Sequence, residues 1–207
     1  MVLNKCFIGD CRDVMRDLIA QGVKVQMCVT SPPYWGLRDY GHPGQLGLEK
    51  TPQDYTARMS EVFLLARDLL RDDGTLWLNL GDSYAGSWGN YGGNNRTAGK
   101  QRAIVSGSRV PNPAWDGLTK FKPMGAVPPD GLKNKDLIGI PWRVAFALQA
   151  DGWYLRSEII WHKVAPMPES VRDRPTRSHE QVFLLAKSER YFYNAEAARD
   201  PLKDTSL

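Results

Sequence analysis

A serine, two prolines and a tyrosine follow one another at Ser31, Pro32, Pro33 and Tyr34, directly after the short apolar run VQMCV. Proline has no backbone N–H to donate, so the Pro32-Pro33 pair must end a strand here, and the two rings hold the backbone rigid. The carbonyl oxygens of Ser31 and Pro32 are thereby left without a local helical partner, beside the Ser31 hydroxyl. This corner therefore offers hydrogen-bond acceptors in a fixed arrangement.

Such acceptors can hold an amino group, and Tyr34 adds a flat surface on which a ring can stack. The combination favours recognition of an exocyclic amine on a planar base. The corner supplies no strong nucleophile, metal ligand or obvious proton shuttle, so the amine itself is expected to attack. The pair His179-Glu180 could suggest acid–base chemistry, but adjacent strand residues point to opposite faces, and we interpret the pair as structural.

Two other polar segments are also expected to follow strands, since a parallel α/β sheet places its ligand site at the carboxyl ends of its strands. Gly9-Asp10 follows the apolar run CFI, and Gly81-Asp82-Ser83 follows LNL. Either segment could be only a turn, and the second could be a helix cap. Both lie where a ligand-binding edge is expected.

Hydrophobic periodicity predicts the elements that must position these residues. In order they are strand 6–8, a helix carrying Val14, Leu18 and Ile19, strand 24–29, helix 54–71, strand 75–83, a helix beginning at Pro141, and strands within 154–163 and 181–194. The segment Asp72-Asp73-Gly74 is expected to close the second helix, and Trp77, Trp142 and Trp153 are expected to pack in the core or between helix and sheet. The alternation of strands and helices predicts an α/β fold with a parallel sheet and crossover helices.

The alternation stops between residues 84 and 135, which are rich in Gly, Asn, Ser and Pro. This segment divides the chain into a catalytic α/β part (1–83), a basic insertion (84–135) and the remainder of the sheet (136–207). The insertion could be flexible with solvated charges, or it could contact nucleic acid and become ordered on binding. Its basic bias favours the second interpretation. The candidate DNA-contacting residues are Arg96, Lys100, Arg102 and Arg109.

A second irregular basic stretch surrounds Pro175 and contributes Arg172, Arg174 and Arg177. It could be a solvated loop or a loop that contacts phosphates, and residue types alone do not separate these possibilities.

Composition bounds the class of protein. The 207 residues carry a formal net charge of +4, which weakly favours a polyanionic partner. Three cysteines without a CxxC pair or a Cys/His cluster at zinc-ligand spacing argue against a disulfide framework and a structural metal. No apolar run approaches membrane-spanning length and the first residues lack an apolar signal core, so we expect a cytoplasmic protein with no membrane partner.

The segment TSPPYWGLRDYG resembles the catalytic motif of amino-methylating DNA methyltransferases. The segment GDCRDVM is similar to the Gly-Asp segment of that family near the cofactor adenine. Further segments, LIGIPWRVAFALQADGWYLRSEIIWHK and RPTRSHEQVFLLAKSERYFYN, resemble the downstream blocks of the permuted group in which the catalytic motif comes first. The resemblance implies the Rossmann-like α/β fold of S-adenosylmethionine-dependent methyltransferases, circularly permuted. Serine at the start of the motif is most similar to bacterial and phage cytosine-N4 enzymes, and adenine-N6 methylation stays open.

The resemblance also implies roles for residues. The target base would be flipped out of double-stranded DNA, because its amine is unreachable in the stack. Ser31 and the Pro32 carbonyl would hold the amine, Pro33 would fix the geometry and Tyr34 would stack on the base. Asp10 would accept from the adenine amino group of S-adenosylmethionine with Cys11 alongside, and Ser31 would direct the amine toward the methyl group.

One expected part has no match. The Phe-x-Gly-x-Gly-like turn that lets the backbone approach the cofactor in this family is not found in the sequence. We therefore expect an incomplete sheet with open apolar edges beside the Gly-Asp and SPPY strands, completed by a missing C-terminal half or a partner chain. Under the alternative interpretation the chain is a truncated DNA-binding remnant without catalytic activity.

Overall fold

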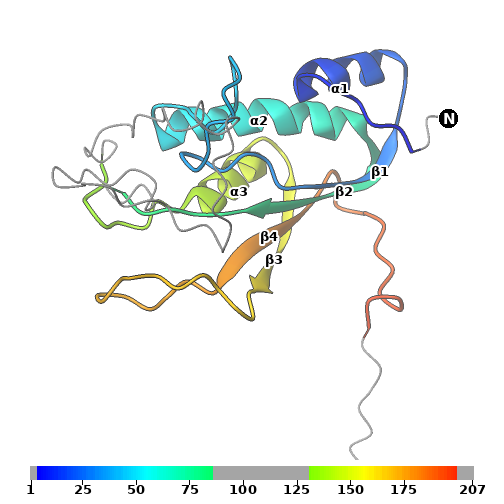
Figure 1. The fold of residues 1–207 in the computed structure, drawn as a ribbon. Helices are drawn as coiled ribbons and strands as arrows, with labels where there is room; N and C mark the ends of the chain where they lie inside the picture. Colours follow the sequence, from blue (N-terminus) through cyan, green and yellow to red (C-terminus); the bar gives the residue numbers. More distant parts are fainter. Residues whose placement is uncertain (1–3, 86–130, 200–207) are drawn as a thin grey trace, which may run out of the picture.

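The computed structural model describes residues 4–85 and 131–199, which form three helices and one four-stranded sheet (Figure 1). The elements in chain order are α1 (Cys11–Ala20), β1 (Val25–Thr30), α2 (Pro52–Leu69), β2 (Leu70–Leu80), α3 (Ile140–Ala150), β3 (Tyr154–His162) and β4 (His179–Ala186). This arrangement confirms the α/β class. None of the described helices is long and apolar enough to cross a membrane.

The sheet is mixed, whereas the sequence pattern predicted a parallel one. Its strand order is β1-β2-β4-β3, in which β1 and β2 are parallel and β4 is antiparallel to both of its neighbours. No helix separates β3 from β4, so the chain returns through residues 163–178 and pairs the two strands as a long hairpin. A parallel pair needs a crossover connection, which is why only the β1–β2 pair, joined through α2, is parallel.

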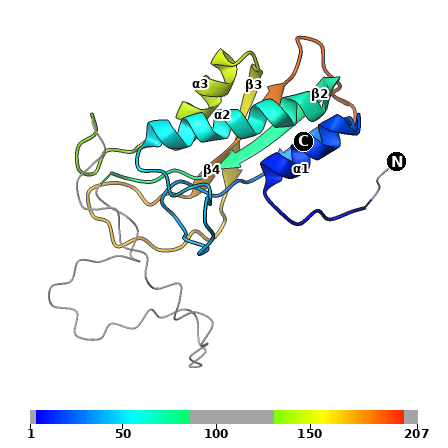
Figure 2. The ribbon, with the colours of Figure 1, turned by 90° about the horizontal axis from the view of Figure 1, so that it is seen from above.

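Helices α2 and α3 cover one face of the sheet (Figures 1 and 2). The apolar stripe predicted for α2 is confirmed, because Met59, Phe63 and Ala66 are buried against the sheet. On the sheet side, Leu78 and Phe183 are fully buried. Further members of this core are Tyr55, Leu76, Leu80, Val144, Leu148, Trp153 and Leu185.

Several predicted boundaries and one predicted strand were wrong. Helix α2 ends at Leu69, and the segment Asp72-Asp73-Gly74, predicted to close it, lies instead in a bulge of β2, where the register jumps from Val25–Leu70 to Met27–Thr75. The strand predicted at 6–8 is not formed, since these residues have no neighbouring strand to pair with among the described residues. The segment 187–194 also lies outside β4.

Two of the three tryptophans occupy the predicted positions. Trp153 is buried, and Trp142 of α3 packs edge-on against Phe183 of β4, with ring centroids 5.0 Å apart. Trp77 instead lies on the sheet face opposite the helices, because it alternates along β2 with the buried Leu76 and Leu78.

The edge strand β1 pairs only with β2 within the described residues. Its outward residues Met27 and Val29 are 54% and 69% exposed. Both side chains alternate with Cys28, which packs against the core, so they lie on the opposite face of β1; the open apolar edge next to the SPPY segment stays a prediction.

Candidate functional site

The mixed sheet brings four chain segments together at one end of its strands. The chain leaves β1 at Thr30 and β2 at Leu80, and these parallel strands end side by side. Strand β4 runs the opposite way, so its first residues lie beside the end of β2, with Gln181 opposite Leu80. Strand β3 ends next to the start of β4, where His162 pairs with His179. Side chains from all four segments can therefore meet at this end of the sheet.

The SPPY corner leaves β1 in the rigid form expected from its prolines. The Pro33 carbonyl accepts a hydrogen bond of 2.9 Å from the Tyr55 hydroxyl, which fastens the corner to α2. Among the described residues no donor contacts the carbonyl oxygens of Ser31 and Pro32. These two oxygens and the Ser31 hydroxyl are the acceptors that the sequence predicted.

The Tyr34 hydroxyl lies among polar groups from three segments. Ser31 Oγ lies 3.1 Å from Tyr34 Oη, Asn79 Oδ1 of β2 lies at 2.8 Å, and Glu180 Oε2 of β4 lies at 3.1 Å. Glu180 is in turn paired with Lys163, which follows β3. Burial first, and then the charge of Glu180, raise the pKa of Tyr34 above its ordinary value. The tyrosine is therefore neutral and available as a hydrogen-bond donor at physiological pH.

The ring of Tyr34 packs directly against the backbone at Gly81. A Cβ atom at Gly81 would lie only 2.4 Å from Cε2 and 2.5 Å from Cδ2 of the ring. Glycine is thus required here by the close approach of an aromatic side chain, since its φ angle is not in the positive range.

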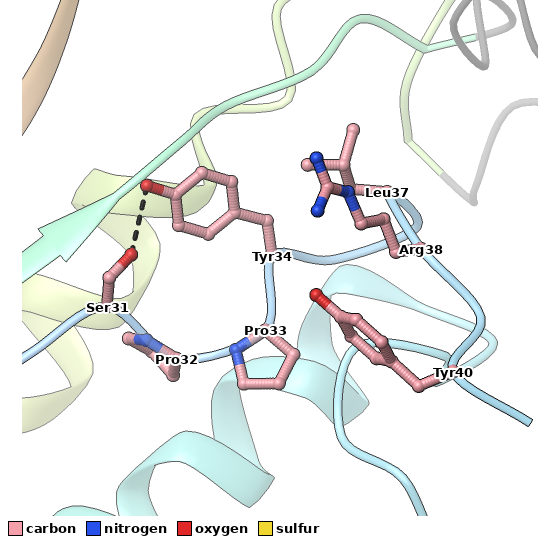
Figure 3. A pocket seen from close by; sticks show the side chains of 7 residues that line it. All are labelled: Ser31, Pro32, Pro33, Tyr34, Leu37, Arg38 and Tyr40. Atoms are coloured by element: carbon pink, nitrogen blue, oxygen red, sulfur yellow. Dashed lines mark hydrogen bonds between the residues drawn. The ribbon is translucent and has the colours of Figure 1, made fainter. Parts of the chain in front are cut away.

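A cavity of about 330 Å³ opens beside this corner. It is lined by Ser31, Pro32, Pro33, Tyr34, Leu37, Arg38 and Tyr40 (Figure 3). In Figure 3 the Tyr34 ring stands between Ser31 and the group formed by Leu37 and Arg38. The buried Trp35, whose indole N–H donates to the Glu49 carbonyl at 2.8 Å, anchors the loop behind the cavity. A rigid wall of this size is suitable for a single planar ring.

Asp82 is a helix cap rather than a free carboxylate. The sequence allowed either a turn or a helix cap for the Gly81-Asp82-Ser83 segment, and the structure shows the cap. It accepts hydrogen bonds of 3.0 Å from the backbone N–H groups of Gly139 and Ile140, at the start of α3. Burial raises the pKa of Asp82, and the N–H donors of Ile140 and Ser83 oppose that rise. The carboxylate therefore joins the end of β2 to a helix 57 residues later in the chain.

Asp10 caps α1, and Cys11 is the first residue of that helix. Arg12 donates to Asp10 from its guanidinium at 2.6 Å and from its backbone N–H at 2.9 Å, and these bonds lower the pKa of Asp10 to about 2. The chain reverses between α1 and β1, so the start of α1 and the end of β1 lie toward the same end of the molecule (Figures 1 and 2). The cofactor role of Asp10 and Cys11 stays a prediction.

The predicted DNA-contacting residues divide into three groups. Arg96, Lys100, Arg102 and Arg109 lie outside the described residues. Arg174 pairs with Glu169 at 2.6 Å and stacks over the Tyr84 ring at 3.9 Å, and Arg177 donates to Gln181 at 3.0 Å. Arg172 is exposed and makes no ion pair with another described residue. Of these three, Arg172 is the one that makes no ion pair or side-chain hydrogen bond with the part of the chain that the structure describes.

Sequence reasoning singled out Gly81 as part of a strand-end segment and interpreted Glu180 as structural, but it missed Asn79 and Lys163, and it assigned no definite role to the cavity-lining Leu37, Arg38 and Tyr40. Glu180 was interpreted as structural because adjacent residues of a strand point to opposite faces, and its contact with Tyr34 depends on the antiparallel course of β4, which the predicted parallel sheet did not include. A signal was present for the last three, since they follow the SPPY segment within six residues. Within residues 4–85 and 131–199, no three His, Cys, Asp or Glu side chains are grouped to hold a metal ion.

Comparison with known proteins identifies this arrangement. Residues 25–206 match the family model N6_N4_Mtase, described as DNA methylase. The chain is 46% identical over 208 residues to type II methyltransferase M.SmaI of Serratia marcescens, covering 98% of this chain and 62% of that protein. It covers 58% of two further type II methyltransferases, so it spans about three fifths of the length of these three relatives.

Two solved structures share the fold. The PvuII DNA methyltransferase, titled cytosine-N4-specific, superposes with a TM-score of 0.53 at 13% identity, covering 93% of this chain and 52% of that chain. A protein of Thermus thermophilus assigned as a DNA modification methylase, complexed with S-adenosyl-L-methionine, gives 0.51 at 20% identity, covering 94% and 61%. At these identities the likeness concerns the fold.

Proposed function

The chain belongs to the N6/N4 family of DNA methylases, and from this premise we propose that it carries the base-binding half of a type II DNA methyltransferase. The proposed reaction is methylation of the exocyclic amine of a base flipped out of double-stranded DNA. The observation that carries the proposal is the cavity at the SPPY corner, where amine acceptors and an aromatic ring line one space of about 330 Å³. A DNA substrate implies a cytoplasmic location.

The residues of the corner act by positioning. The Ser31 hydroxyl and the free Pro32 carbonyl accept the two hydrogens of the amine, which leaves the nitrogen lone pair directed away from them. Pro33 and its bond to Tyr55 keep these acceptors from moving as the base enters. Tyr34 stacks on the base. Holding a reactant in one attacking geometry removes much of the entropic barrier to the transfer step.

S-adenosylmethionine supplies an electrophilic methyl group when bound. Asp10 can accept a hydrogen bond from the adenine amino group of the cofactor. Its side chain is 38% exposed, and Oδ2 accepts one hydrogen bond, from Arg12, so this oxygen retains acceptor capacity. We assign Asp10 and Cys11 to that end of the cofactor and Ser31 to the end where the methyl group meets the amine.

Cytosine N4 is the target we favour. On its Watson–Crick edge, cytosine presents two adjacent acceptors beside its amine, N3 and O2, whereas adenine presents one there, N1. Among the described residues that line the cavity, Arg38 is the only cation, and its guanidinium carries donors suited to paired acceptors. The serine that opens the motif supports the same choice. Nucleoside mass spectrometry of methylated DNA distinguishes N4-methylcytosine from N6-methyladenine.

Contacts to the DNA backbone are assigned to the exposed Arg172 and, in the insertion, to Arg96, Lys100, Arg102 and Arg109. Arg174 and Arg177 have a different proposed part: their internal bonds shape the loop that presents Arg172. Replacing Arg172 by glutamine should weaken DNA binding uniformly across sequences and reduce its salt dependence.

The test measures transfer of labelled methyl groups from S-adenosylmethionine to duplex DNA by the 207-residue chain together with a segment that supplies the Phe-x-Gly-x-Gly-like turn. Ser31→Ala and Tyr34→Ala should abolish transfer, while Ser157→Ala, at an exposed serine of β3, serves as control. Transfer that survives both corner substitutions would contradict the assigned roles. If calorimetry detects DNA binding but no cofactor binding, and no transfer occurs, the chain is instead a non-catalytic DNA-binding protein.

A further inference from the structure

The Tyr34 hydroxyl joins the corner to two strands that lie far from it in the sequence. Asn79 and Glu180 are 45 and 146 residues away along the chain, yet both place an oxygen within 3.1 Å of it. Ser31, three residues away, is the third partner at 3.1 Å. The orientation of the ring is therefore decided by tertiary contacts as well as by the stiff backbone.

The donors and acceptors of this cluster can be assigned. The amide nitrogen of Asn79 donates to the Gln181 carbonyl at 3.1 Å, so its Oδ1 must face Tyr34. With Ser31 donating to Tyr34, the single hydroxyl hydrogen of the tyrosine lies between two acceptors, Asn79 Oδ1 and Glu180 Oε2. The other oxygen of Glu180 pairs with Lys163.

Glu180 is ionised in this setting. Its side chain is only 22% exposed, and burial by itself would raise its pKa, but the hydrogen bond and charge of Lys163 outweigh burial and lower it. A hydrogen bond to a carboxylate is in general stronger than one to a neutral acceptor. Here the neutral Asn79 Oδ1 is the nearer acceptor, at 2.8 Å, and Glu180 Oε2, at 3.1 Å, gives the tyrosine hydroxyl a second, charged anchor.

The Tyr34 ring is also constrained along its side, where it packs against the backbone of Gly81. Gly81 approaches so closely that not even a methyl group would fit between the backbone and the ring. Tyr34 also lines the cavity, so the ring is held between Gly81, the hydroxyl anchor and the space assigned to the base. A change at the hydroxyl would alter the angle at which the ring meets that space.

We propose that Glu180, with Lys163 as its counter-ion, is a positioning residue that orients Tyr34 for stacking on the target base. The inference rests on the proposed function and adds to it two residues outside the SPPY motif. Glu180 does not touch the base; it acts through the hydroxyl of Tyr34.

The first test is spectroscopic and needs no methyl transfer. With tyrosines labelled at ¹³Cζ, the Tyr34 resonance is identified by its loss in Tyr34→Phe and followed as the pH rises through tyrosine ionisation. Glu180→Gln keeps an acceptor but removes the charge, so the pKa of Tyr34 should fall. The charges that face Tyr34 are those of Glu180 and Arg177, with Tyr55 adjacent on α2. The control Glu158→Gln, at an exposed carboxylate of β3, should leave the Tyr34 titration unchanged.

The second test compares transfer kinetics of Glu180→Ala and Glu180→Gln. Loss of the anchor should lower kcat/KM by about tenfold or more, and the glutamine should restore it to within about threefold of the wild type. A Tyr34 titration that is identical in Glu180→Gln and in the wild type overturns the inference, even if Glu180→Ala unfolds. If the Tyr34 titration is shifted in Glu180→Gln but the wild-type protein transfers no methyl groups, the proposed function is overturned instead. The two failures are therefore distinguishable.

Discussion

The contact between Gly81 and the Tyr34 ring gives the sharpest prediction, made by the substitution Gly81→Ala. The added Cβ would lie 2.4 Å from Cε2 of the ring, and ordinary contact begins at 3.4 Å, so the ring must withdraw by about 1 Å. A movement of that size lengthens the hydroxyl bonds of 2.8 Å to Asn79 and 3.1 Å to Glu180 beyond the usual limit. The same movement would tilt the surface on which the base is proposed to stack.

The magnitude follows from these contacts. Losing a side-chain hydrogen bond costs about 1 kcal/mol, and more when a carboxylate is the acceptor. Overpacking adds roughly 1–3 kcal/mol. We therefore expect Gly81→Ala to lower the free energy of unfolding by about 2–4 kcal/mol, measured by urea denaturation with tryptophan fluorescence.

The control is the same substitution in a Tyr34→Ala background. Without the ring there is no clash, and since φ of Gly81 is not positive, alanine should be neutral or stabilise by up to about 1 kcal/mol through the unfolded chain. In a Tyr34→Phe background the ring remains but its hydroxyl bonds are gone, so only the packing cost of Gly81→Ala should remain. Equal destabilisation in the wild-type and Tyr34→Ala backgrounds would refute the explanation.

Four further predictions concern the groups that support the site. Asp82→Ala removes the acceptor for the N–H groups that begin α3 and should lower the free energy of unfolding by about 2–3 kcal/mol in urea. Because burial raises the pKa of Asp82, the proton-linked part of its effect on stability is fully present below the unfolded pKa and is lost as the pH rises through the folded value, while the hydrogen bonds to α3 remain. Asp82→Asn should abolish this pH dependence. Tyr55→Phe removes the bond to the Pro33 carbonyl and should cost about 1 kcal/mol in the same assay. Asp10 has a folded pKa of about 2, so it should stabilise α1 at pH values above its ordinary pKa of 3.8 and lose that effect as the pH falls toward 2. The exposure of its side chain limits the effect to under about 1 kcal/mol. Acid unfolding of Asp10→Asn compared with the wild type checks this prediction.

Local pattern was sufficient for most elements and for the corner. The spacing of Met59, Val62, Phe63 and Ala66 predicted α2, because a helix repeats its buried face every three to four residues whatever lies opposite. The prolines predicted where β1 ends, because the missing N–H is a property of the residue itself. The family was likewise predicted from short segments and is confirmed by the match over residues 25–206.

Strand direction was decided only by the tertiary structure. An apolar run reads the same whether its strand is parallel or antiparallel, since direction depends on which distant segment it pairs with. The antiparallel course of β4 brings Glu180 to Tyr34. The end of β2 lies next to the start of α3 in the folded chain, so Asp82 can cap that helix from 57 residues away. By itself, the sequence determined a rigid corner with amine acceptors and a ring. The mixed sheet, through contacts between residues far apart in the chain, decided which groups hold that ring and at what angle.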